Sequence, residues 1–280
     1  MTKKKIYLAW LSTGKREDIH IYLLRDLQKR YGDKVELVLP DQCCWRTFHD
    51  AARNAAVDNF LASDCDVLWF LDSDVCPPAH ILELVTNEWD KWQVAGAPYP
   101  IFMPVPGREE HSILFTAYKG VLNDPDQPGI YMADVPQSGA EMVDALATGC
   151  LFIKREVFAK LEKPYFEFKF DHESRRIKEG EDLGFALKLS RLGIQFYCDY
   201  GMVCKHYKTL DLLDMNNYAI EMANYKVQEY HKSAMADVGQ VIAAAKEKYF
   251  RDGFAAGVEA AKGPQRSKAG LILPQSLNTR

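Results

Sequence analysis

The chain has 280 residues, of which 48% are hydrophobic and 26% are charged, and its net charge is −4. This composition excludes wholesale disorder, a collagen-like repeat and a small disulfide scaffold. The acidic balance argues against a strongly basic protein that binds nucleic acid without sequence preference. The charge is uneven, because residues 205–280 carry 11 basic and 8 acidic side chains whereas residues 1–204 carry 24 and 31.

The first hundred residues alternate between strand and helix patterns. Short apolar runs predict buried strands at residues 6–11, 35–39, 67–71 and 93–97. Apolar residues at helical spacing predict helices at residues 19–31, 47–61 and 77–89. Strands that alternate with helices predict an α/β fold with parallel strands and right-handed crossovers.

The middle of the chain has a different pattern. Seven prolines between residues 98 and 140 predict loops and short antiparallel strands. Further on, we expect strands at residues 143–153 (broken by Thr148-Gly149), 165–170, 194–197 and 201–205. Helices are expected at residues 155–161 and 180–193.

The last part of the chain, from residue 210 to 262, is rich in alanine, methionine and lysine and predicts helices. We therefore divide the chain into an α/β domain at residues 1–207 and a helical C-terminal extension with a polar tail at residues 208–280. Small residues punctuated by Tyr249, Phe250 and Phe254 predict that these helices pack on the first domain or form an oligomer interface.

The cysteines and the apolar runs bear on the compartment. The seven cysteines form no CxxC pair, which indicates a reducing environment. The apolar stretch at residues 6–11 follows three lysines but is too short for the core of a signal peptide. The longest membrane-like run, at residues 67–71, is far below the ~20 residues of a spanning helix. We therefore expect a soluble, cytoplasmic protein without a transmembrane segment.

The most hydrophobic predicted strand ends in Asp72-Ser73-Asp74. Ligands of open parallel sheets bind at the carboxyl ends of the strands. Two carboxylates at one strand end repel each other unless a cation lies between them, and a divalent cation could bridge them to a diphosphate. The alternative is a turn in which one of the two aspartates caps the following helix.

Four further motifs surround this pair of aspartates. In chain order they are Ala-Arg-Asn-Ala at 52–55, Thr-Gly at 148–149, Gly-Glu-Asp at 180–182 and Cys-Lys-His at 204–206. With the Asp-x-Asp motif and in this order, they resemble the GT-A class of nucleotide-sugar-dependent glycosyltransferases, including the family 2 type. The resemblance covers about residues 5–208 and implies a GT-A, Rossmann-like fold with a mixed, mostly parallel sheet flanked by helices.

The resemblance implies a role for each matched residue. A divalent cation, Mn²⁺ or Mg²⁺, would offset the charge of the diphosphate as the sugar bond breaks. Its ligands would be Asp72, Asp74 and His206. The donor, a UDP-sugar, would be bound by Ser12, Thr13, Arg53, Asp72, Ser73 and Lys208. The catalytic acidic pair would be Glu181 and Asp182, with Asp182 as the base that deprotonates the acceptor hydroxyl.

Each of the basic residues has a structural alternative. Arg53 could be a solvated helix residue paired with Asp50 or Asp58. His206 could be an ordinary histidine at the end of a strand, and Lys208 could be a solvated lysine before a helix.

The acidic pair and the Thr-Gly motif have structural alternatives as well. Glu181 or Asp182 could only cap a helix, and Thr148-Gly149 could be only a β-bulge. A retaining enzyme needs no base at Asp182, so the sequence leaves the stereochemistry of transfer open.

These motifs predict a metal-dependent glycosyltransferase whose acceptor is a glycan, a lipid head group, a protein, a small molecule or a modified DNA base. The alternatives are a non-catalytic nucleotide-sugar-binding protein and a nucleotidyltransferase of similar fold. The latter usually has a Gly- and Arg/Lys-rich loop after the first strand, and the chain lacks one. The dinucleotide and P-loop glycine motifs and paired zinc-ligand spacing are also absent from the sequence.

Overall fold

The computed structural model describes residues 3–11, 17–39, 48–104, 111–119, 131–132, 139–171, 173 and 176–208, with further positions between residues 219 and 248. The chain divides into two compact units, Met1–Leu210 and Asp211–Arg280. The described residues of the second unit are helical and exposed. In the described part of the chain, no helix is long and apolar enough to cross a membrane.

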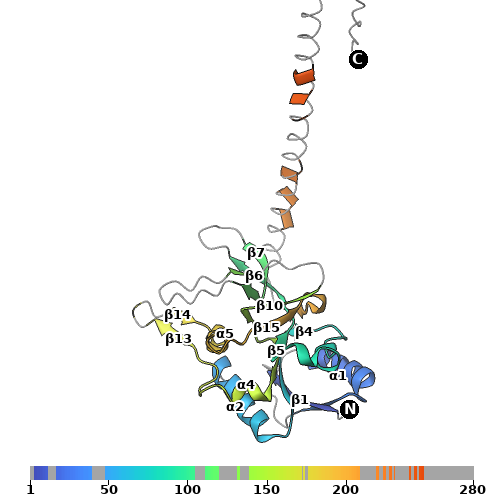
Figure 1. Ribbon diagram of the computed structural model, residues 1–280, viewed down its shortest axis with the longest axis vertical. Coiled ribbons are helices and arrows are strands. Elements are labelled where there is room, and N and C mark those ends of the chain that lie inside the picture. The colour runs from blue at the N-terminus through green and yellow to red at the C-terminus, as the bar shows by residue number, and fades with distance from the viewer. Residues whose placement is uncertain are drawn as a thin grey trace, which may run out of the picture. The chain divides into compact units, whose positions relative to one another are not determined.

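A seven-stranded sheet forms the centre of the first unit (Figure 1). Across the sheet, its strands are β10 (Ala140–Val143), β15 (Phe196–Asp199), β5 (Val94–Gly96), β12 (Cys150–Lys154), β3 (Val67–Asp72), β1 (Lys4–Leu11) and β2 (Val35–Val38). The strand β1 is parallel to β2 and β3, and β15 is parallel to β5. By contrast, β12 runs antiparallel between β3 and β5, and β10 runs antiparallel to β15. The expected mixed, mostly parallel sheet is confirmed.

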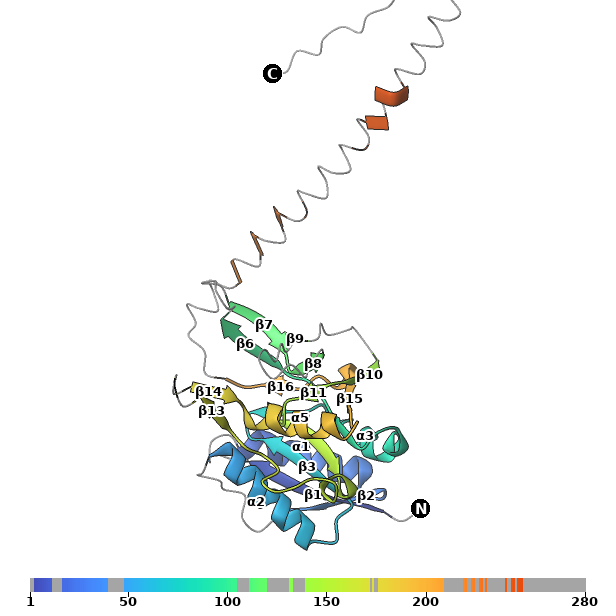
Figure 2. The ribbon, with the colours of Figure 1, turned by 60° about the vertical axis from the view of Figure 1, so that its left-hand side comes forward.

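Helices cover both faces of this sheet. One face is covered by α1 (Glu17–Tyr31) and α3 (Glu83–Thr86), and the other by α2 (His49–Ala62), α4 (Arg155–Phe158) and α5 (Glu181–Arg191). Side chains of a strand alternate between faces, so Trp69 and Leu71 of β3 pack with α1 and α3 while Leu68 and Phe70 pack with α2, α4 and α5. Figures 1 and 2 show α1 and α2 on opposite sides of β1.

Short antiparallel ladders adjoin the sheet, and some of them lie in the proline-rich middle of the chain, where such strands are expected. A three-stranded ladder consists of β11 (Ala145–Leu146), β8 (Ala117–Lys119) and β9 (Tyr131–Met132). Two-stranded ladders pair β6 (Pro100–Pro104) with β7 (His111–Phe115), β13 (Lys169–Asp171) with β14 (Arg176–Glu179), and β4 (Val75–Cys76) with β16 (Lys205–His206).

The helix expected at residues 77–89 is wrong in its extent. The chain forms only α3 and the 3-10 helix η1 (Trp89–Lys91) there, and β4 precedes them. After Pro78 the chain first forms tight turns, in which the Ile81 N–H donates to the Pro78 carbonyl at 3.1 Å and the Glu83 N–H donates to the His80 carbonyl at 2.9 Å. The strand expected at residues 201–205 is likewise reduced to the 3-10 helix η2 (Tyr200–Met202) and β16.

The strand expected at residues 165–170 is wrong for its first half. The side chain of Asn54 on α2 takes the place of a neighbouring strand. Its Oδ1 accepts hydrogen bonds from the backbone N–H groups of Tyr165 and Phe166 at 2.8 and 3.1 Å, and its Nδ2 donates to the Phe166 carbonyl at 2.7 Å. Because these backbone groups are already paired, only β13 joins a ladder in this segment.

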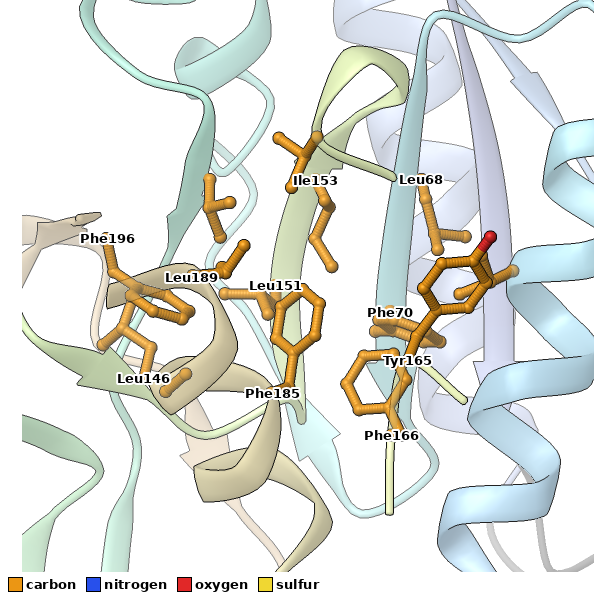
Figure 3. Close-up of a cluster of buried hydrophobic side chains, with 14 of the residues drawn as sticks. Leu68, Phe70, Leu146, Leu151, Ile153, Tyr165, Phe166, Phe185, Leu189 and Phe196 are labelled. Atoms are coloured by element: carbon orange, nitrogen blue, oxygen red, sulfur yellow. The ribbon is translucent and has the colours of Figure 1, made fainter. Parts of the chain in front are cut away.

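A stack of aromatic rings attaches α5 to the sheet (Figure 3). The ring of Phe185 is fully buried and stacks on Phe166, with centroids 4.5 Å apart. Phe166 in turn meets Phe70 of β3 edge-on at 5.4 Å. The start of α5 is therefore held at a fixed place beside the carboxyl end of β3.

We expect Phe185→Ala to lower the free energy of unfolding by about 3–5 kcal/mol, because it leaves a cavity in the aromatic stack. Phe170→Ala is the matched control, since Phe170 is 56% exposed, and it should change stability by less than about 0.5 kcal/mol. Urea unfolding followed by fluorescence measures both. Equal losses for the two variants would contradict this account of the core.

Candidate functional site

The Asp72-Ser73-Asp74 segment is fixed from both sides at the end of β3. The backbone N–H of Asp72 donates to the Gly149 carbonyl at 3.0 Å, and that of Ser73 donates to the Leu11 carbonyl at 3.0 Å. These bonds connect the segment to the chain just before β12 and to the end of β1. Its side chains therefore lie at the carboxyl ends of parallel strands, the expected place for a ligand.

The guanidinium of Arg53 joins this strand end to α5. Its Nη1 and Nη2 donate to the two oxygens of Asp72 at 3.3 and 3.2 Å, and its Nε donates to Glu181 Oε1 at 3.5 Å. Arg53 is only 3% exposed and lies over the ring of Phe70. The alternative of a solvated Arg53 paired with Asp50 or Asp58 is therefore wrong, because this side of α2 faces the sheet.

This arrangement shares one buried cation between two carboxylates. Burial opposes the charge of Arg53, but Asp72 and Glu181 outweigh it and raise the pKa of the guanidinium. Both oxygens of Asp72 accept from Arg53, so the structure places Asp72 with Arg53 instead of with Asp74 and His206. Arg53 itself is turned toward these carboxylates and not toward open solvent.

Asp74 and His206 come together because β4 pairs with β16. In this ladder His206 lies opposite Val75, and His206 Nε2 is 3.5 Å from Asp74 Oδ2. The ammonium of Lys208 also contacts Asp74 Oδ2. Burial opposes ionisation of Asp74, but the hydrogen bonds from His206 and Lys208 outweigh burial and hold the pKa of Asp74 well below its usual range.

A backbone carbonyl determines that Nδ1 of His206 carries a proton. His206 Nδ1 is 2.8 Å from the Pro100 carbonyl, which can only accept, so Nδ1–H donates. Nε2 donates to Asp74 when the ring carries both protons, and in the neutral ring it presents a lone pair that a cation could take. The ring also meets Tyr99 edge-on at 4.7 Å. A metal-ligating histidine is typically oriented in this way by a bond at its other nitrogen.

This donor set fits part of a divalent-metal site. Asp74 and His206 would hold the cation, and phosphate oxygens and water would complete its shell, as is usual for Mg²⁺ and similar ions. Among the described residues, no three His, Cys, Asp or Glu side chains are grouped closely enough to hold a metal. Of the three expected ligands, the structure therefore brings together Asp74 and His206.

Asp182 lies at the start of α5, beside Glu181. The helix begins after Gly180 without a side-chain cap, and Asp182 Oδ1 accepts from the Leu183 N–H at 2.8 Å. Glu181 does not cap the helix but contacts Arg53. Burial, and then the charge of Glu181, raise the pKa of Asp182. Asp182 also lines a cavity of about 190 Å³.

The remaining expected site residues have different outcomes. Ser12 and Thr13 lie outside the described residues. Gly149 is required by a close approach, because a Cβ there would lie 2.7 Å from the hydroxyl of Tyr99. Sequence reasoning missed Tyr99, which is buried between Gly149 and His206. The only signal for it was its position just after the predicted strand at residues 93–97.

Comparisons with known proteins give distant likenesses. No protein-family model and no curated protein matches the chain. Among solved structures, A197 from STIV is 20% identical, with a TM-score of 0.45 over 74% of this chain and 86% of its own. GalNAc-T7, solved with UDP, GalNAc and Mn²⁺, is 14% identical, with a TM-score of 0.43 over 75% of this chain. This chain covers 44% of GalNAc-T7. These likenesses are too weak to support a function. The functional argument therefore rests on the site residues.

Arg53→Ala should lower the free energy of unfolding by about 3–5 kcal/mol, because it leaves Asp72 and Glu181 close together without their shared cation. Arg30→Ala is the matched control, since Arg30 also pairs with a carboxylate, Asp26, but on the surface of α1. We expect a far smaller loss for Arg30→Ala. Chemical denaturation measures the loss for each variant. A loss for Arg53→Ala no larger than that for Arg30→Ala would show that the Arg53 cluster does not stabilise the fold.

Proposed function

We propose that the chain is a metal-dependent glycosyltransferase that moves a sugar from a nucleotide-diphosphate sugar, such as a UDP-sugar, to an acceptor hydroxyl. The observation that carries this proposal is the Asp74–His206 pair at the carboxyl end of β3, with Nε2 of His206 turned toward Asp74 by the Pro100 carbonyl. A divalent cation held there would neutralise the diphosphate as it leaves. The ammonium of Lys208, which contacts Asp74, would bind the phosphates.

The second part of the proposed chemistry is proton removal by Asp182. The proton of the acceptor hydroxyl passes to the Asp182 carboxylate, and the acceptor oxygen forms a bond to the anomeric carbon. The bond from that carbon to the diphosphate breaks, and its electron pair leaves with the diphosphate oxygen. A carboxylate whose pKa is raised by burial is a stronger base than an exposed one, which suits this step.

The metal requirement can be tested before any acceptor is known. With Mn²⁺ and a panel of UDP-, GDP- and TDP-sugars, we expect slow donor hydrolysis that excess EDTA abolishes. Asp74→Asn and His206→Ala should each weaken Mn²⁺ binding, measured by electron paramagnetic resonance, and lower hydrolysis at least about tenfold.

Asp58→Asn is the matched control for Asp74→Asn, because Asp58 also pairs with a lysine, Lys163, but on the exposed side of α2. This variant should behave as wild type. Full hydrolysis in excess chelator would contradict the proposal. Donor binding without any turnover would instead favour a non-catalytic nucleotide-sugar-binding protein.

Asp182→Asn tests the role of Asp182 as the base. This substitution should slow transfer but stabilise the fold. Loss of the proton acceptor should slow transfer by about 10²–10⁴-fold while donor affinity is nearly unchanged. Because burial raises the pKa of Asp182 in the folded state, its ionised form destabilises the fold at neutral pH, and protonation removes this effect as pH falls. We therefore expect Asp182→Asn to have a higher Tm than wild type at pH 7, with the difference shrinking at acid pH. A capping role alone predicts a mild change in both quantities, since Asn caps almost as well as Asp.

A further inference from the structure

The cavity beside Asp182 contains a second polar group that the proposed reaction has not yet used. The described residues that line it are Tyr118, Ala145, Leu146, Gly180, Asp182 and Leu183. It lies between the start of α5 and the β8–β11 ladder, in which Tyr118 pairs with Ala145. The described part of its wall is therefore mostly aliphatic, with one carboxyl group and one phenol.

The two polar groups have complementary roles in hydrogen bonding. Burial, and then the negative charge of Asp182, raise the pKa of Tyr118, so its hydroxyl keeps its proton and can donate. Asp182 accepts a backbone hydrogen bond from Leu183 with one oxygen, Oδ1. A carboxylate oxygen has more than one acceptor position, so Asp182 can also accept a proton from a bound hydroxyl.

The electrostatics of the cavity disfavour an anion. The described lining residues include no cation. The nearest buried cation, Arg53, is already shared between Asp72 and Glu181. A phosphate or carboxylate in the cavity would therefore face the charge of Asp182, and none of the described lining residues carries a positive charge to offset it.

We propose that this cavity holds the attacked end of the acceptor, a neutral hydroxyl-bearing ring of about monosaccharide size, and that Tyr118 orients it by a hydrogen bond. The volume of about 190 Å³ is below the range of roughly 300–1,000 Å³ for drug-sized ligands, so it fits one ring and not an oligosaccharide. The aliphatic walls pack against the ring, and Asp182 receives the proton of the attacking hydroxyl. This inference rests on the proposed function because it takes Asp182 as the base.

Direct binding of simple neutral glycosides to the full chain tests this assignment. The probes are methyl α- and β-glucosides and galactosides, with glucuronic acid and glucose 6-phosphate as their charged counterparts, each followed by saturation-transfer NMR. We expect the neutral glycosides to bind, and the charged ones to bind at least about tenfold more weakly.

Variants of the lining residues assign the binding to the cavity. Tyr118→Phe should weaken the neutral glycosides about 2- to 12-fold, the value of one hydrogen bond, whereas Leu183→Trp should abolish binding by filling the cavity. Tyr22→Phe is the matched control, since Tyr22 lies on α1 and is 71% exposed. Should Leu183→Trp fail to fold, Leu183→Phe fills the same space with a smaller ring.

The outcomes separate this inference from the proposed function. Tight binding of the charged sugars, unchanged binding in Tyr118→Phe, or no binding of any neutral glycoside would overturn the inference, even if UDP-sugar hydrolysis is intact. Absence of hydrolysis with every donor, together with glycoside binding that Tyr118→Phe weakens, would overturn the proposed transferase instead and leave the cavity as a neutral-sugar site.

Discussion

The buried guanidinium of Arg53 is the interaction on which the candidate site depends, because it joins α2, the end of β3 and the start of α5. A charge removed from water is tolerated only while its partners satisfy it, so Arg53, Asp72 and Glu181 hold one another in place. The two carboxylates of each acidic motif therefore have different surroundings. Asp72 and Glu181 pair with Arg53, whereas their neighbours Asp74 and Asp182 are the residues to which we assign the cation and the proton of the proposed reaction.

The charges around these two remaining carboxylates separate the site into unlike halves. Asp74 has His206 and Lys208 beside it, and their hydrogen bonds outweigh burial and lower its pKa, so this carboxyl group stays ionised. Asp182 has Glu181 as its neighbour in an apolar setting, which raises its pKa and suits proton transfer. Pairs of acids whose environments move their pKa values in opposite directions commonly perform different steps of one reaction.

The sequence predicts the local features of this arrangement and not its distant partners. The strand that ends at Asp72 and the helix that begins at Glu181 follow from apolar runs and spacing within short segments. The partners of Arg53 lie 19 and 128 residues away, so no local pattern indicates them. The same holds for Tyr165 and Phe166, whose alternation is typical of a strand but whose backbone pairs with Asn54, over 100 residues earlier. Tyr118 lies in a proline-rich stretch without periodicity, and it becomes informative only once Asp182 is seen to face the same cavity.

The partial burial of Asp182, which raises its pKa, persists because packing holds the helix that carries it. An isolated helix of fewer than about 12–15 residues is marginal in water, so α5, with 11 residues, depends on packing. Residues three apart share one face of a helix, which places Asp182 on the same side as the fully buried Phe185. Any rotation that brought the carboxylate to solvent would pull Phe185 away from Phe166 and expose Leu189, which is also fully buried. The aromatic stack therefore offsets the desolvation of the proposed base, and the same packing fixes its position beside the cavity.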